Sequence, residues 1–129
     1  MSESAAGQNP LIVSVARVAG VAPGRSAAGS HAGLIWLVAT DEGKSPGVEA
    51  QIAAALRKVD RLLKELGSRR ENIISATMYL TEENHRSILN GIWDEWVGSD
   101  RRYWPQRCCV VVDLSPGTLF EITAVAAVG

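Results

Sequence analysis

The chain has 129 residues, the size of a single domain, and 47% of them are hydrophobic. This composition supports a buried core and excludes a disordered or fibrous protein. The net charge of −1 and the pI near 6.1 lack the basic excess of nucleic-acid binders, so we expect no nucleic-acid partner. The apolar runs are shorter than the roughly 20 residues that cross a bilayer, and the first residues lack a secretory signal pattern. We therefore expect a cytoplasmic protein without a membrane partner.

The cysteines and histidines indicate neither a disulfide nor a metal site. Cys108 and Cys109 are the only cysteines and are neighbours in an apolar run. Adjacent side chains on a strand point to opposite faces, so we expect two free thiols. His31 and His85 have no ligand-type spacing to a cysteine or carboxylate cluster, and we expect no metal.

The first half of the chain is predicted to open with strands. Residues 1–10 are expected to be a flexible lead-in, and residues 11–129 one domain. Strands are predicted at 11–18, at 34–39 and, more weakly, around 25–30. The continuous apolar character of residues 34–39 indicates a strand that is buried on both faces.

Two amphipathic helices follow. Ser45 is predicted to cap the first, Pro46 suits its first turn, and Gly67 ends it. Thr81 is predicted to cap the second, whose first turn would carry acidic residues. Each helix has one apolar face: Val48, Ile52, Leu56, Val59, Leu63 and Leu66 in the first, and Ile88, Leu89, Ile92, Trp93, Trp96 and Val97 in the second.

The remaining strands are predicted at 73–80, 107–113 and 119–128, the last two joined as a hairpin through residues 115–117. The order is therefore strand, weak strand, strand, helix, strand, helix, strand, strand. Two helices cover only one face of such a sheet. Because the last strand is apolar on both faces, we expect a second copy of the chain to cover the other face.

Three polar residues interrupt apolar segments. Arg107 begins one strand, Glu121 lies inside the last, and Asn90 interrupts the apolar face of the second helix. A buried charge is costly unless it is paired. One interpretation is a structural Arg107–Glu121 pair, within a chain or between subunits. The other is that Arg107 binds an anionic ligand while Glu121 positions or deprotonates a water. The hairpin register decides whether the two side chains share a face, and the sequence leaves it open.

A family resemblance is carried by four segments: 73–81, 90–96 (NGIWDEW), 105–110 (PQRCCV) and 120–122 (FEI). With them the chain resembles the YjgF/RidA (Rid) family of enamine/imine deaminases over roughly residues 11–128, and most of all its YoaB-like branch. The proline, one residue, arginine pattern and the late glutamate on a strand are the most specific of these marks.

The resemblance implies a chorismate-mutase-like α+β fold with a mixed six-stranded sheet, assembled as a homotrimer around a central β-barrel. It implies hydrolysis of a reactive 2-imino or enamine acid to the 2-oxo acid and ammonia, with no cofactor. Arg107 would bind the substrate carboxylate, and Glu121 would orient the water. The same resemblance places Asn90 and Cys109 in the substrate cleft. We also expect substrate-site roles for Arg25, Val38, Ala39, Trp104 and Cys108, of which Trp104 is a candidate wall of the pocket.

The chain also departs from the family pattern. Many deaminating members carry a tyrosine where this chain has Arg25, and a Ser-Gly pair where it has Val38 and Ala39. An alanine methyl is expected to crowd a backbone approach that glycine allows. The main alternative to a general deaminase is therefore a ligand-binding trimer with an altered pocket, which is either non-catalytic or specialised for one pathway. An endoribonuclease, an activity ascribed to some members, is disfavoured by the net charge.

Overall fold

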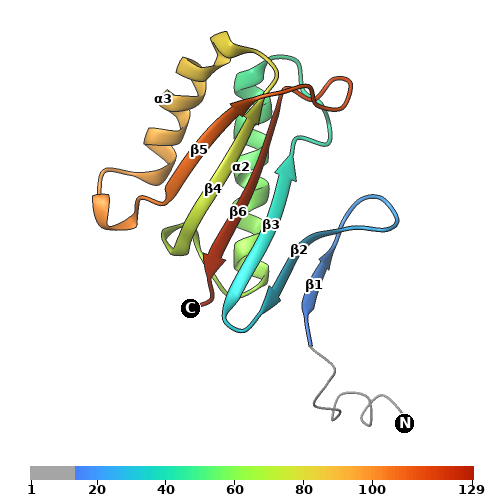
Figure 1. Ribbon diagram of the computed structural model, residues 1–129, viewed down its shortest axis with the longest axis vertical. Coiled ribbons are helices and arrows are strands. Elements are labelled where there is room, and N and C mark those ends of the chain that lie inside the picture. Colours follow the sequence, from blue (N-terminus) through green and yellow to red (C-terminus); the bar gives the residue numbers. More distant parts are fainter. Residues whose placement is uncertain (1–13) are drawn as a thin grey trace.

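The computed structural model describes residues 14–129, which form a six-stranded sheet with two helices on one face (Figure 1). The strand order is β1-β2-β3-β6-β4-β5. All neighbouring strands are antiparallel except β4 and β5, which run parallel. The mixed sheet with two helices is the expected fold class. The strands are β1 (Ala16–Ala19), β2 (Ser26–His31), β3 (Leu34–Thr40), β4 (Ile73–Leu80), β5 (Gln106–Val111) and β6 (Phe120–Ala127).

The helices are α2 (Val48–Glu65) and α3 (Arg86–Val97). In Figure 1, α2 lies behind the sheet and α3 lies along the edge next to β5. Three short 3₁₀ turns complete the connections: η1 (Arg70–Asn72), η2 (Glu83–His85) and η3 (Arg101–Tyr103).

The core lies between the sheet and the helices. Alternate residues of each strand are buried there, because side chains on a strand alternate between faces. The expected stripe of α2 is buried from Val48 to Leu63, and Leu89 and Trp93 of α3 complete the layer. The largest fully buried sheet residues are Ile35, Met78, Leu80, Phe120 and Ile122.

The opposite face of the sheet has no helix over it. One row across this face consists of Val38, Thr123, Thr77 and Cys108, which are cross-strand partners on β3, β6, β4 and β5. Trp36 on the same face keeps 48% of its surface exposed. We call this surface the open face. In one copy, residues 34–39 are therefore not buried on both sides, contrary to expectation.

The start of α2 differs from the prediction. The helix begins at Val48 after Gly47, and no side chain caps it. Ser45 is not the cap, because Gly47 occupies the N-cap position; the Ser45 backbone N–H donates to Asp41 Oδ2 at 2.9 Å. Asp41 Oδ1 also accepts from the Gly43 N–H at 3.0 Å, so an aspartate four residues upstream orders this loop.

The end of α2 agrees with the prediction. Gly67 has a φ of 80°, a conformation that side chains disfavour. The Gly67 and Ser68 N–H groups donate to the carbonyls of Lys64 and Leu63, the pattern of a Schellman motif.

The start of α3 also differs. The turn η2 intervenes, α3 begins at Arg86, and its first turn has no acidic residue. Thr81 caps nothing, since its buried hydroxyl has no hydrogen-bond partner. Glu83 instead pairs with Arg86 at 2.7 Å.

The predicted hairpin of the last two strands is wrong. β4 lies between β5 and β6, pairing parallel with β5 and antiparallel with β6. The loop from 112 to 119 therefore crosses one end of the sheet. It contains a β-turn, closed by a 2.9 Å hydrogen bond from the Thr118 N–H to the Ser115 carbonyl, but this turn does not join two paired strands. Residues 1–13, which include the predicted lead-in and the start of the predicted first strand, lie outside the described residues.

Candidate functional site

Arg107 lies at the start of β5 and its side chain turns toward α3. Its Nη2 donates a 2.6 Å hydrogen bond to Asn90 Oδ1, and its guanidinium lies 5.9 Å from the centre of the Trp93 ring. The structure thus brings together Arg107 and Asn90, two residues that the sequence singled out. The side chain is half-buried, and most of its donors remain available to a ligand.

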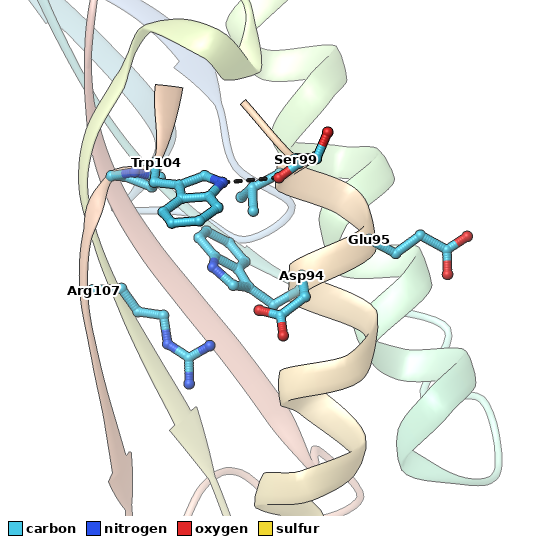
Figure 2. Close-up of a pocket in the computed structure, with 9 residues that line it drawn as sticks. Asp94, Glu95, Ser99, Trp104 and Arg107 are labelled. Carbon is cyan, nitrogen blue, oxygen red and sulfur yellow. Dashed lines mark hydrogen bonds between the residues drawn. The ribbon is translucent and has the colours of Figure 1, made fainter. Parts of the chain in front are cut away.

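Arg107 also borders a cavity of about 660 Å³ between the end of α3 and the segment that enters β5. Trp104 forms one wall, and its Nε1 donates to the Gly98 carbonyl at 2.8 Å (Figure 2). We call this space the Arg107 cavity; its lining is Trp93, Asp94, Glu95, Val97, Gly98, Ser99, Trp104, Pro105 and Arg107. Trp104, one of the residues expected at the substrate site, borders this cavity, and Trp93, which the sequence did not single out as a site residue, borders it too.

Cys109 lies on the same side of β5 as Arg107, two residues further along. Burial raises the pKa of its thiol above the ordinary value, and the nearby charges of Arg86 and Arg107 offset this only in part. The thiol is therefore neutral near pH 7 and is a poor nucleophile. Cys108 points to the open face, 3.8 Å from Thr77 Oγ1, so it does not share the surroundings of Arg107. Both cysteines are free.

Glu121 lies on β6 and faces a second cavity, of about 480 Å³. We call it the Glu121 cavity; it is lined by Val21, Arg25, Ser26, Ala27, Val38, Ala39, Thr40, Glu42, Lys44, Lys58, Ser115, Thr118 and Glu121. Three predicted site residues, Arg25, Val38 and Ala39, are therefore gathered here. Ala39 is 1% exposed, and its methyl group points into the core. The methyl group therefore does not take up space in the cavity, contrary to the expectation.

The charges of the Glu121 cavity are partly compensated. Lys58 pairs with Glu42 at 2.8 Å, and Lys44 donates to the Pro116 carbonyl at 2.6 Å. Within residues 14–129 the ion pairs use the carboxylates of Glu42, Asp60, Glu83 and Asp100. In this part of the chain, neither Arg107 nor Glu121 has an ion-pair partner, so the structural pair between them is not formed within one copy.

A buried amide that the sequence analysis missed holds the loops around Glu121. Gln51, on α2, is 1% exposed. Its Nε2 donates to the carbonyls of Ser45 at 3.0 Å and Gly117 at 2.9 Å, and its Oε1 accepts from the Leu119 N–H at 2.8 Å. The signal that could have identified Gln51 is its position within the apolar stripe of a helix. The amide fixes the chain two residues before Glu121.

Arg107 and Glu121 are separated by the sheet itself. Arg107 is the cross-strand partner of Ala76 on β4, and Ala76 is in turn the partner of Ala124 on β6. Ala124 lies three residues after Glu121 on the same strand. Two strand spacings and three residues of rise put the two backbone positions about 14 Å apart. Ala124 is buried toward the helices and Glu121 lies on the alternate face, so the two side chains point away from each other.

Two features are absent from the described part of the chain, a cluster of metal-ligating side chains and a helix of membrane-spanning type. Residues 14–129 contain no group of three or more His, Cys, Asp or Glu side chains that could hold a metal ion. Neither helix of this region combines the length and apolar character needed to cross a membrane.

Comparison with known proteins gives consistent matches. The family model described as "Endoribonuclease L-PSP" matches residues 28–128. The RutC family protein YoaB of Escherichia coli K12 is 31% identical over 99 residues, which are 76% of this chain and 85% of that protein. A RutC family protein of Haemophilus influenzae is 35% identical over 77 residues, 59% of this chain and 65% of that one.

Solved structures share the fold. A member of the YjgF protein family from Neisseria meningitidis superposes with a TM-score of 0.80 at 32% identity, covering 91% of this chain and 97% of its own. An uncharacterized protein from Pseudomonas aeruginosa gives a TM-score of 0.82 at 26% identity, covering 90% and 100%.

Proposed function

The chain belongs to the YjgF/Rid family, and from this premise we propose that it hydrolyses a carboxylate-bearing enamine or imine to the 2-oxo acid and ammonia. The observation that carries the proposal is the state of Arg107. Its guanidinium is half-buried, is held by Asn90, and has no carboxylate partner within residues 14–129. Such a group is suited to bind a carboxylate through two parallel hydrogen bonds.

The chemistry needs water and a group that moves a proton. Water adds to the electrophilic imine carbon, forming a C–O bond, and the resulting carbinolamine releases ammonia as the C–N bond breaks. No electron is transferred to or from the substrate. We assign Glu121 to accept a proton from the attacking water and return it to the leaving nitrogen. The neutral thiol of Cys109 would line the site without acting as a nucleophile.

The site would be shared between two copies of the chain. Because Arg107 and Glu121 point to opposite sides of one sheet, one copy cannot direct both at one substrate. We propose that Arg107, Asn90 and Cys109 of one subunit face the Glu121 cavity of the next. The open faces would pack together in a homotrimer with a central barrel, which removes Trp36 and its neighbours from water.

An imine-trapping assay tests the activity. An amino-acid oxidase generates 2-imino acids in the presence of semicarbazide, and the rate of semicarbazone formation is followed. We expect the wild-type protein to lower that rate, and Arg107→Ala and Glu121→Ala to lose the effect. Arg101→Ala, which changes an exposed arginine of η3, is the matched control and should behave as wild type. A folded wild-type protein without effect on any imine would contradict the proposal and favour a non-catalytic binding protein.

Mixing the two inactive variants tests the shared site. If Arg107 and Glu121 act from different subunits, co-expressed Arg107→Ala and Glu121→Ala chains regain some interfaces that carry both residues. Random assembly in a closed ring restores about one quarter of the wild-type sites. If both residues act within one subunit, the mixture stays inactive.

A further inference from the structure

We propose that the Arg107 cavity receives the aromatic side chain of a monocarboxylate substrate whose carboxylate is bound by Arg107. This inference rests on the proposed function and names its substrate class. It concerns the part of the ligand that extends away from the reacting carbon.

The walls of the cavity suit a flat apolar group. Trp93 and Trp104 are on its lining, together with Val97 and Pro105. Trp104 leaves 55% of its surface exposed, a large apolar area for a residue that is also fixed in place. The hydrogen bond from its Nε1 to the Gly98 carbonyl fixes the position of the ring at the cavity (Figure 2). A preformed aromatic wall binds another ring with little loss of side-chain entropy.

The position of Arg107 sets the orientation of the ligand. Its guanidinium lies 5.9 Å from the centre of the Trp93 ring, so an anion at Arg107 is next to the aromatic wall. A carboxylate bound there leaves the rest of a 2-oxo or 2-imino acid free to extend between Trp93 and Trp104. The cavity of about 660 Å³ is much larger than a methyl group requires, and is in the range of sites for whole small molecules.

The charges of the lining favour one negative group and disfavour a second. Among residues 14–129, Arg107 is the only cation on the lining, which also includes Asp94 and Glu95. In Figure 2 the Glu95 side chain points away from Trp104 and Arg107, whereas Asp94 is nearer to Arg107. A dicarboxylate would bring its second negative charge toward Asp94. An uncharged aromatic side chain meets no such repulsion.

Calorimetric titration with three 2-oxo acids, the product class of the proposed reaction, tests this inference without requiring turnover. The probes are pyruvate, phenylpyruvate and 2-oxoglutarate. We expect phenylpyruvate to bind at least about tenfold more tightly than pyruvate, because its ring is removed from water, and 2-oxoglutarate to bind no more tightly than pyruvate. Trp104→Ala should reduce the advantage of phenylpyruvate over pyruvate to less than about threefold. Arg107→Ala should abolish binding of all three.

Two further variants complete the test. Tyr103→Ala changes an exposed aromatic neighbour that is not on the lining, and should keep the wild-type preference. Ser99→Trp fills the cavity from its exposed rim without removing a core contact. It should also abolish the preference, even if Trp104→Ala does not fold.

Four outcomes would each overturn the inference. They are equal binding of pyruvate and phenylpyruvate, preferential binding of 2-oxoglutarate, no binding of phenylpyruvate, and a preference that survives Ser99→Trp. Aromatic preference without imine hydrolysis would contradict the proposed reaction alone, and hydrolysis without the preference would contradict this inference alone.

Discussion

The side chains of Arg107 and Glu121 leave the same sheet on opposite sides, two strands and three residues apart. Arg107 turns toward α3, where Asn90 holds it, and Glu121 faces a cavity built by loops that Gln51 connects. Each candidate group is thus supported by its own buried or half-buried amide. The roles of Asn90 and Gln51, of the open face and of the loop before α2 can each be tested by a separate substitution.

Asn90 is expected to hold Arg107 ready for a carboxylate. Removing it in Asn90→Ala loses a hydrogen bond to a charged group, so we expect roughly tenfold weaker substrate binding, seen as a higher KM with kcat nearly unchanged. Asn90→Asp should bind substrate more weakly still, because the new carboxylate pairs with Arg107 and competes with the ligand. Asn84→Ala, at an exposed asparagine of η2, is the control. An Asn90→Asp protein with the wild-type KM would show that Arg107 does not bind the carboxylate.

The open face is expected to join copies of the chain. Thr123→Arg places a charge in the middle of this face, beside Val38 and Thr77, where assembly would bury it. We expect light scattering after size exclusion to report a monomer that remains folded by circular dichroism. Ala50→Arg adds the same charge on the exposed side of α2 and should leave the assembly intact. A Thr123→Arg protein that still assembles would place the interface elsewhere.

Gln51 is expected to be essential for stability and for the placement of Glu121. Gln51→Leu leaves the carbonyls of Ser45 and Gly117 and the Leu119 N–H without their partly buried partner, which should lower the free energy of unfolding by roughly 2 kcal/mol. Urea denaturation measures this loss. Gln51→Glu can still accept from the Leu119 N–H but cannot donate to Ser45 or Gly117, so we expect a folded protein with reduced kcat. Wild-type kcat in Gln51→Glu would mean that these bonds do not position Glu121.

Asp41 is expected to make the loop before α2 sensitive to acid. Hydrogen bonds from Ser45, and to a lesser extent from Gly43, lower the pKa of the Asp41 carboxyl group below its ordinary value of 3.8. As the pH falls, the unfolded chain takes up the proton first. The stabilisation is therefore present above the ordinary pKa and is lost as the pH falls through the folded-state value.

The measurement compares wild type with Asp41→Ala by urea denaturation at several pH values. At pH 7 we expect the variant to be less stable by about 1 kcal/mol, as for loss of a helix cap, with the difference shrinking below about pH 4. Glu65→Ala, at an exposed carboxylate at the end of α2, is the control. A stability difference that is the same at every pH would contradict this role.

Cys109 is expected to react slowly with alkylating agents. Because burial raises the pKa of its thiol, little thiolate is present at pH 7. In a Cys108→Ser protein, the iodoacetamide rate should still be rising above pH 9, the ordinary value for the thiol. A plateau near neutral pH would instead identify Cys109 as a reactive thiolate.

The local features of the fold could be predicted from the sequence because they depend on neighbours along the chain. The apolar residues of α2 and α3 recur every three or four positions, so the buried sides of both helices follow from spacing alone. Gly67 ends α2 at a positive φ that glycine adopts without strain. The strand 73–80 was predicted with its observed bounds. The four short sequence segments that carry the resemblance likewise identified the family.

Other features depend on contacts between distant segments, which only the tertiary structure decides. Ser45 is a residue type that caps helices, but in the folded loop Asp41 accepts from the N–H groups of Gly43 and Ser45, and α2 begins only after Gly47. The placement of β4 between β5 and β6 replaces the expected hairpin, because strand pairing is selected by burial of the whole sheet against two helices. That pairing directs Arg107 and Glu121 to opposite sides. The sequence identified both charged residues, but only the order of the strands determined that one copy of the chain keeps them apart.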